Sequence, residues 1–219
     1  FHSACLRILR SHATRLGYRP SFTVYDDVDS RRLIEMVMDE LGLDTRRLPP
    51  RAVAGVISQA KADLVGAEEF HVDPNAGDPY LRRIAEVYRE YQRRLLASNA
   101  MDFDDLLARA VELLANHEDI RSSYQARFRH ILVDEYQDTN RAQDELVLIL
   151  GRSHGNVCVV GDADQSVYRW RGADIRNILE FEKAFTDATT IVLEQNYRST
   201  QTILAAANAV ISHNLSRRP

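Results

Sequence analysis

The sequence contains few of the features that mark secreted or membrane proteins. Only two cysteines, Cys5 and Cys158, occur among its 219 residues, which excludes a disulfide framework and fits a reducing compartment. No hydrophobic run is long enough to cross a bilayer, and no signal peptide is visible. We therefore expect a soluble, cytoplasmic protein that has no membrane partner.

Lysine is also scarce, because Lys61 and Lys183 are the only lysines and the other basic residues are arginines. A phosphate-binding loop of the form G-x-x-x-x-G-K-[ST] needs a Gly-Lys pair, and neither lysine follows a glycine, so such a loop is excluded from this chain. The histidines form neither an H-E-x-x-H motif nor a Cys/His cluster, and no G-x-S-x-G motif occurs. The sequence therefore indicates neither a structural zinc site nor a hydrolase of the serine-nucleophile kind.

The sequence does contain enough apolar residues to form a folded core, since 45% of the chain is hydrophobic. The net charge of −4 gives no overall attraction for nucleic acid, so contact with a polyanion would need a local patch. Arg7, Arg10, Arg15 and Arg19 form such a basic face, because no acidic residue occurs before Asp26.

The N-terminal part of the chain has helical patterns, and the remainder alternates between strands and helices. Helices are predicted over residues 1–16 (ending near Gly17), 28–41, 50–65, 78–97, from 101 onward, and over 118–127, 140–150, 173–184 and 199–213. Three short β-branched runs at 131–133, 157–160 and 191–193 predict parallel strands buried on both faces. This order indicates an α/β fold. Because the chain starts within a helical pattern and without Met, we expect a fragment excised from a longer protein.

Polar residues follow each of the three predicted strands. Asp134 and Glu135 come directly after the first strand, where one carboxylate can bind Mg²⁺ and the other can orient or deprotonate a water that attacks a γ-phosphate. The alternative is an ordinary helix start, which also favours acidic residues. A metal site and a helix cap are also the alternatives for Asp102, Asp104 and Asp105, and capping is the better explanation there.

The second strand is followed by Gly161 and then by Gln165, whose amide could bind a phosphate or a water. A tyrosine, a tryptophan and two arginines come next, and this composition is typical of a loop on which single-stranded bases stack while guanidinium groups bind phosphates. The alternative is that Trp170 only packs the loop against the protein. After the third strand, Arg198 precedes a helix capped by Ser199 or Thr200, where it could bind a phosphate or form an ordinary ion pair.

Taken together, these segments resemble motifs of the superfamily 1 DNA helicases of the UvrD, PcrA and Rep group. The motifs are VDEYQDTN at 133–140, VGDADQSVYRWRGA at 160–173 and NYRS at 196–199. FHS at 1–3 and DFDDL at 102–106 resemble two further markers of that group, and they occur in the right order. The resemblance spans essentially the whole chain.

The resemblance implies a RecA-like P-loop NTPase core with a parallel sheet, plus an inserted all-helical subdomain. Residues 1–17 and 100–195 would form the RecA-like domain called 1A. Residues 18–99 would form the helical insertion 1B, and residues 196–219 the truncated start of the second RecA-like domain, 2A.

The resemblance also implies roles for individual residues. At the ATP site, Asp134 and Glu135 would bind Mg²⁺, and Glu135 would also be the general base. Gln165 would contact the γ-phosphate, Tyr197 would stack on adenine, and Arg198 would act as an arginine finger. Those on the single-stranded DNA path are Phe1, His2, Tyr168, Trp170 and Arg171, with Trp170 stacking on a base.

The implied function is an ATP-dependent 3′→5′ DNA helicase and translocase. It would move on single-stranded DNA and unwind duplexes at single-strand/double-strand junctions in repair or replication, with repair proteins as further partners. Because the phosphate loop and the later motifs are missing, we expect this chain alone to be inactive. The alternatives are the helicase subunit of a RecB/AddA-type helicase–nuclease and a non-catalytic module that binds DNA or protein.

Overall fold

The computed structural model describes residues 1–70, 79–166, 168 and 172–213. Its α-helices are α1 (His2–His12), α2 (Asp27–Glu40), α3 (Pro50–Ala62), α4 (Pro79–Ala97), α5 (Phe103–Asn116), α6 (Glu118–Arg127), α7 (Arg141–Gly151), α8 (Arg176–Leu179), α9 (Phe181–Ala184) and α10 (Gln201–Ile211). Its 3-10 helices are η1 (Ala13–Leu16), η2 (Tyr136–Asp138) and η3 (Ala163–Gln165), and its strands are β1 (Thr23–Val24), β2 (Ala100–Met101), β3 (Ile131–Val133) and β4 (Val157–Val159).

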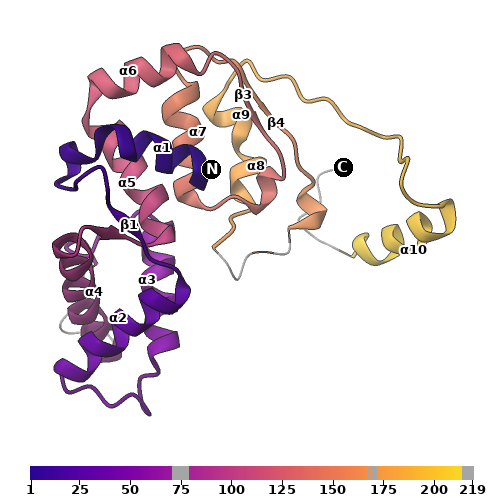
Figure 1. The fold of residues 1–219 in the computed structure, drawn as a ribbon. Coiled ribbons are helices and arrows are strands. Elements are labelled where there is room, and N and C mark those ends of the chain that lie inside the picture. The colour runs from indigo at the N-terminus through magenta and orange to yellow at the C-terminus, as the bar shows by residue number, and fades with distance from the viewer. Residues whose placement is uncertain (71–78, 167, 169–171, 214–219) are drawn as a thin grey trace.

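The helices pack around two large hydrophobic cores. The first core is built mainly from α1, α5, α6 and α7 and includes the fully buried Leu9 and Leu113. The second core is built mainly from α2, α3 and α4 and includes the fully buried Val37, Val53 and Leu95. Figure 1 shows the helices of the second core below those of the first, with α3 packed against α5 where the two cores meet.

Strands β3 and β4 pair in parallel, with residues 131–133 opposite residues 157–159. They pack against α7, α8 and α9, because Val133 forms a small apolar cluster with Val147 of α7 and Ile178 of α8. A second parallel pair, β1 with β2, joins the chain before α2 to the chain after α4. Parallel strands connected through helices confirm the expected α/β class. The β1–β2 pair was not predicted.

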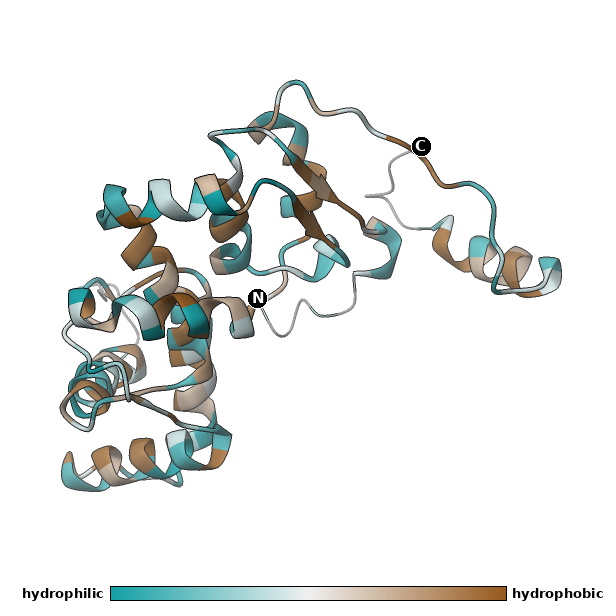
Figure 2. Cartoon of the chain, turned by 45° about the horizontal axis from the view of Figure 1, so that its top comes forward, coloured by the Kyte–Doolittle hydropathy of each residue, from teal (hydrophilic) through white to brown (hydrophobic). Residues whose placement is uncertain are grey.

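The expectation of three strands buried on both faces was wrong. Residues 191–193 pair with no strand in the described part of the chain, and their side chains are 74–82% exposed. Leu132 in β3 is 77% exposed, and Figure 2 shows β3 and β4 as brown, strongly apolar ribbons. β-branched residues favour extended backbone, but a segment forms a strand only where a neighbour takes up its backbone hydrogen bonds.

The predicted helices are largely confirmed, with differences at their ends. The range 173–184 is an exception, because it is divided into α8 and α9 at Glu180. Gly17 ends the first helical segment in the left-handed region at φ 80°, a conformation that glycine adopts without strain. Among the helices of the described ranges, none is long and apolar enough to cross a membrane.

The acidic residues at the start of α5 cap that helix, as the sequence predicted. Asp102 accepts a hydrogen bond from the Asp105 backbone N–H at 2.8 Å, and the Asp105 carboxylate accepts one from the Asp102 N–H at 3.3 Å. This reciprocal pair is a capping box, which satisfies two backbone donors that the first helical turn would otherwise leave unpaired.

Candidate functional site

The first candidate residues lie directly after β3. Asp134 and Glu135 are both exposed, and the backbone of Glu135 is in the left-handed region at φ 52°. Asp134 Oδ1 accepts a hydrogen bond of 3.0 Å from the Glu135 backbone N–H. A non-glycine residue at positive φ carries strain of the kind found at functional sites. The turn therefore presents two adjacent carboxylates at the carboxyl end of the strand, where α/β proteins bind ligands.

A buried glutamine connects these carboxylates to the end of β4. Gln137 is 1% exposed, its Nε2 donates to Glu135 Oε2 at 2.7 Å, and its Oε1 accepts from the Asp162 backbone N–H at 3.1 Å. An amide side chain has one donating and one accepting end. Gln137 can therefore join an acceptor after one strand to a donor after the next.

The hydrogen bonds continue from Asp162 to Gln165. Gln165 Nε2 donates to Asp162 Oδ2 at 2.7 Å, while Asp162 Oδ1 caps η3 by accepting from the backbone N–H of the second residue after it. Glu135, Gln137, Asp162 and Gln165 thus form one continuous chain of hydrogen bonds, which we name the strand-end network. The sequence singled out Glu135 and Gln165 and gave no role to the two residues between them. One signal in the sequence could have identified Gln137 and Asp162, namely that each comes shortly after one of two predicted parallel strands.

Gly161 allows the two strand ends to approach each other this closely. A Cβ atom on Gly161 would lie 2.4 Å from Gln137 Oε1 and 2.7 Å from Ile178 Cδ1. At the same level, the Tyr136 backbone N–H donates to the Val160 carbonyl at 3.0 Å. Any side chain at position 161 would displace the Gln137 amide, so the strand-end network depends on a glycine at this position.

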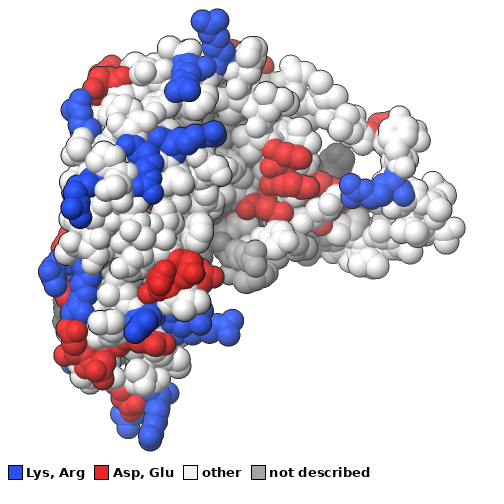
Figure 3. Space-filling model, viewed as in Figure 1, with Lys and Arg blue, Asp and Glu red and all other residues white. Residues whose placement is uncertain are grey.

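The two adjacent carboxylates at the end of β3 suit a magnesium ion. Mg²⁺ is usually bound through one or two carboxylates together with waters and substrate phosphates. Asp134 and Glu135 offer such oxygens, and Figure 3 shows acidic side chains gathered in the region of the strand ends. Within the described residues, no group of three or more His, Cys, Asp or Glu side chains could hold a metal ion on its own. Asp134 and Glu135 could therefore supply two carboxylate ligands to a cation whose remaining ligands are waters or a bound molecule.

A second candidate region is a groove of about 540 Å³ between α3, α5 and the start of α7. We name it the α3–α5 groove. Its lining is mostly polar or aromatic, with no lysine or arginine among the described lining residues, and includes His2, Ser58, Gln59, Asp104, Leu107, Asp138, Asn140, Gln143 and Tyr168. Aromatic rings and amides can stack on and hydrogen-bond with planar polar groups such as nucleobases.

The N-terminal residues lie at this groove. His2 contacts Phe103 with ring centroids 6.1 Å apart in an edge-to-face arrangement. Burial lowers the pKa of His2, which favours the neutral ring. Phe1 precedes α1 and is 39% exposed. The structure thus brings His2 and Tyr168, two residues predicted to contact DNA, into the lining of one groove.

The loop after η3 runs from the strand-end network to this groove. Ser166 Oγ donates to the Gln137 carbonyl at 3.4 Å, which attaches the start of the loop to η2. Tyr168, which lines the groove and is 42% exposed, comes only two residues later. The predicted stacking residue Trp170 and its neighbour Arg171 lie outside the described residues.

Asp104 is a partly buried carboxyl in the wall of the groove. Burial, and then the nearby Asp102 carboxylate, raise the pKa of Asp104 to about 6, although Ser58 donates a hydrogen bond to it and Lys61 attracts its charged form. The folded chain therefore holds this proton up to a higher pH than the unfolded chain does. The stabilisation from the Asp104 proton is complete below about pH 4 and is lost as the pH rises through about 6.

We expect the free energy of unfolding of the wild type to fall, relative to that of Asp104→Asn, by about 1–3 kcal/mol between pH 4 and pH 7. Urea unfolding at a series of pH values measures this difference. Asp39→Asn, at an exposed position on α2, is the matched control for the loss of one carboxylate. A difference for Asp104→Asn that does not change with pH would contradict the assignment.

The third motif is not brought to the strand-end network in this structure. Tyr197 is 92% exposed, and Asn196 Oδ1 accepts hydrogen bonds from the backbone N–H groups of Arg198 and Ser199 at 2.9 and 2.8 Å. Figure 1 shows the chain running from α9 to α10, which stands apart from the other helices. The roles of Tyr197 and Arg198 at the nucleotide therefore stay predictions.

Part of the predicted basic face is engaged in internal contacts. The Arg10 guanidinium lies 4.0 Å from the centre of the Phe22 ring, and Arg15 pairs with Asp119 at 2.8 Å. These arginines therefore stabilise the packing of the N-terminal segment, and the groove offers a better-defined candidate for DNA contact.

One protein family accounts for most of the chain. The model of the UvrD/REP helicase N-terminal domain matches residues 1–186, which include β3, β4, the strand-end network and the α3–α5 groove.

Similar proteins align with the chain over its full length. It is 51% identical over 227 residues to the ATP-dependent DNA helicase UvrD1 of Mycobacterium tuberculosis (strain H37Rv), covering 100% of this chain and 29% of the relative. It is 48% identical over 219 residues to the ATP-dependent DNA helicase PcrA of Bacillus subtilis (strain 168), with the same coverage. The chain thus spans less than a third of the length of these relatives.

Proposed function

Since this chain belongs to the UvrD/REP helicase family, we propose that it supplies half of the ATP site and part of the DNA path of an ATP-dependent 3′→5′ DNA helicase and translocase. The substrates are single-stranded DNA and junctions between single-stranded and duplex DNA, and the process served is DNA repair or replication. Relatives named as ATP-dependent DNA helicases support this proposal.

The observation that carries the proposal is the strand-end network. Glu135 is held by Gln137 at 2.7 Å, and Gln137 is linked through Asp162 to Gln165. A general base must be oriented toward the proton that it removes, and a fixed carboxylate meets that need. Glu135 is therefore the base that deprotonates the attacking water, and Gln165 contacts the γ-phosphate.

Asp134 and Glu135 would hold Mg²⁺, which neutralises charge on the β- and γ-phosphates when it is bound. The protein's part is to position these carboxylates, since Asp134 Oδ1 accepts from the Glu135 backbone N–H and Glu135 Oε2 accepts from Gln137 Nε2. Because Gln165 and Glu135 belong to one hydrogen-bonded chain, a shift of Gln165 on loss of the γ-phosphate changes the support of the base and the position of the loop that follows.

That loop leads to the DNA path. Tyr168 and His2 line the α3–α5 groove, and Phe1 directly precedes His2 in the chain. We assign Trp170 as a base-stacking residue and Arg171 as a phosphate contact, on the grounds of the sequence motif alone. The short connection from Gln165 to Tyr168 provides a route from the nucleotide to the DNA.

The domain assignment follows the same proposal. Residues 1–17 and 100–195 belong to a RecA-like domain, and residues 18–99 to a helical insertion. Residues 196–219, with Tyr197 on adenine and Arg198 as arginine finger, start a second RecA-like domain that closes on the nucleotide.

Single-stranded DNA binding by the 219-residue chain tests the proposal. Replacing Tyr168 by alanine should weaken binding of a fluorescent oligothymidylate about tenfold, because base–aromatic stacking contributes roughly 1–3 kcal/mol per base. Fluorescence anisotropy at fixed salt measures the affinity. Tyr80→Ala is the matched control, because Tyr80 on α4 is 49% exposed and does not line the groove, so the DNA affinity of this variant should equal that of the wild type. Equal affinities for Tyr168→Ala and the wild type would contradict the assignment of the groove.

A further inference from the structure

One of the chain's two lysines is buried in the interior. Lys61 on α3 is 3% exposed, and its Nζ lies 2.6 Å from Asp102 Oδ2 and 3.0 Å from Asp105 Oδ1. Lysine is almost never fully buried unless it is paired. The ATP and DNA sites described above leave this group without a role.

Residues from α4 and from the start of α5 converge on this lysine. Asp102 and Asp105 form the capping box of α5, and α4 adds two further bonds. Tyr91 Oη donates to Asp102 Oδ2 at 2.9 Å, and Gln92 Nε2 donates to Asp105 Oδ1 at 3.1 Å. These five residues, Lys61, Tyr91, Gln92, Asp102 and Asp105, are the Lys61 cluster.

The Lys61 cluster lies where the two hydrophobic cores meet. Tyr91 of α4 belongs to the second core, as does Ile57, one turn before Lys61 on α3. Leu106, which follows Asp105 on α5, belongs to the first core. A charged hydrogen bond has stricter geometry than apolar packing, so it fixes how α3 and α5 are placed relative to each other.

The same two helix segments form walls of the α3–α5 groove. Ser58, Gln59 and Ala62 of α3 lie on either side of Lys61 in the sequence, and Asp104 of α5 lies between the two carboxylates that hold it. The bond between α3 and α5 therefore fixes the separation of two groove walls.

We propose that Lys61 is a positioning residue, which sets the placement of the helices α2–α4 relative to α5 and thereby the width of the groove that takes single-stranded DNA. The DNA part rests on the proposed function, whereas the placement of the helices does not. Buried ion pairs are often replaceable by apolar residues at no loss of stability. The role that we assign to the cluster is therefore geometric, and its test has to measure the placement of the helices as well as stability.

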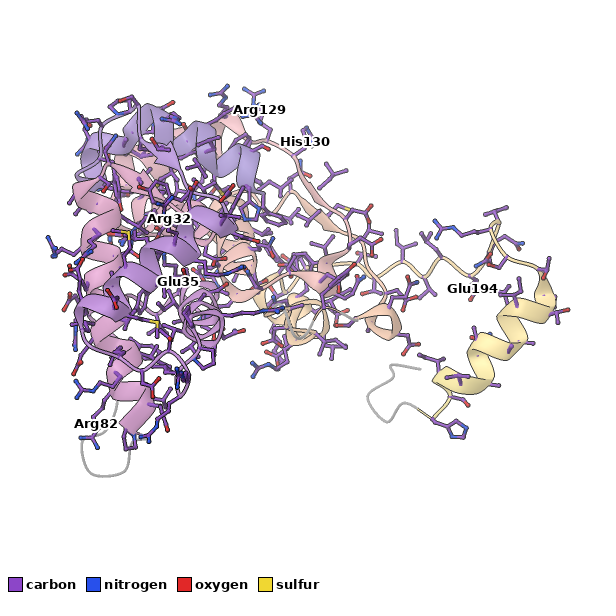
Figure 4. The ribbon with its side chains drawn as sticks, turned by 60° about the horizontal axis from the view of Figure 1, so that its bottom comes forward. Arg32, Glu35, Arg82, Arg129, His130 and Glu194 are labelled. Carbon is purple, nitrogen blue, oxygen red and sulfur yellow. The ribbon has the colours of Figure 1, made fainter. Side chains whose placement is uncertain are left out.

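The test uses a variant in which Asp105 keeps a cationic neighbour, because Arg109 Nε lies 3.9 Å from Asp105 Oδ1. Lys61→Met with Asp102→Asn removes one charge of each sign, and asparagine caps helices about as well as aspartate. Lys183→Met, at an exposed lysine that pairs with Glu180, is the matched control. Spin labels are placed at two exposed positions, Glu35 on α2 (Figure 4) and Ser122 on α6, and the exposed Cys158 is changed to serine. The distance between the labels reports how the helices of the second core are placed relative to those of the first.

We expect the double variant to fold, with a broader or shifted spin–spin distance distribution and about tenfold weaker oligothymidylate binding, while Lys183→Met matches the wild type. A wild-type distance distribution in the folded double variant would overturn the positioning role. An altered distribution with wild-type DNA affinity would overturn the link to the groove. Absence of DNA binding by the wild type itself would contradict the proposed function, and the distance measurement would still decide the role of Lys61.

Discussion

Replacing Lys61 alone by methionine is expected to lower the free energy of unfolding by about 3–5 kcal/mol, because removal of one partner leaves buried charges uncompensated. Burial and the neighbouring Asp102 raise the pKa of Asp105. Burial acts in the same direction on Asp102, yet the Lys61 ammonium holds the pKa of Asp102 below its ordinary value. Without the ammonium, both carboxyls would resist ionisation in the folded chain.

The pH dependence of this loss has a definite sign. In Lys61→Met the folded state binds protons at Asp102 and Asp105 more readily than the unfolded state does. The stability of the variant therefore rises as the pH falls, and its deficit relative to the wild type is larger at pH 8 than at pH 5.

Urea unfolding followed by circular dichroism at both pH values measures the deficit. Lys183→Met should stay within about 0.5 kcal/mol of the wild type, because its side chain is 75% exposed. A deficit for Lys61→Met no larger than that of this control would contradict the prediction.

The sequence could not predict the burial of Lys61. It showed that lysine is scarce, and a lysine in an amphipathic helix is normally placed on the solvent side. The acidic pattern at Asp102 and Asp105 did predict the capping box, because capping depends on residues three positions apart. That the same carboxylates also hold Lys61 depends on how α3, α4 and α5 meet, and no local pattern encodes this.

The same distinction applies to the strands and the candidate site. The position of β3 was predicted from its β-branched run, and α6 matches the predicted range 118–127. The run at 191–193 has the same local character, but no strand pairs with it in the described ranges. Gln137 was missed because its role depends on the pairing of β3 with β4 and on the close approach at Gly161.

Replacing Glu135 by glutamine is expected to abolish most ATP hydrolysis in a longer form of the protein that carries a phosphate loop. Loss of a general base lowers turnover by about 10²–10⁴-fold. Glutamine has nearly the shape of glutamate, and its Oε1 can still accept the hydrogen bond that Gln137 Nε2 now donates to Glu135. The strand-end network should therefore persist, and the variant should lose basicity while keeping its geometry.

DNA-stimulated release of phosphate measures this effect, and oligothymidylate binding should be unchanged. Glu35→Gln, at an exposed position on α2, is the control for the loss of one carboxylate. Turnover in Glu135→Gln equal to that of Glu35→Gln would show that another group is the base.

The 219-residue chain alone provides the complementary test. Phosphoryl transfer is catalysed by positioning and charge stabilisation, and this chain contains no Gly-Lys pair to hold the β- and γ-phosphates. Arg198 lies on the segment that leads to α10, which stands apart from the other helices (Figure 1). Hydrolysis by the wild-type chain should therefore not exceed that by its Glu135→Gln variant. A turnover well above that of the variant would mean that Asp134, Glu135 and Gln165 suffice for catalysis. It would contradict the expectation that a second domain is needed.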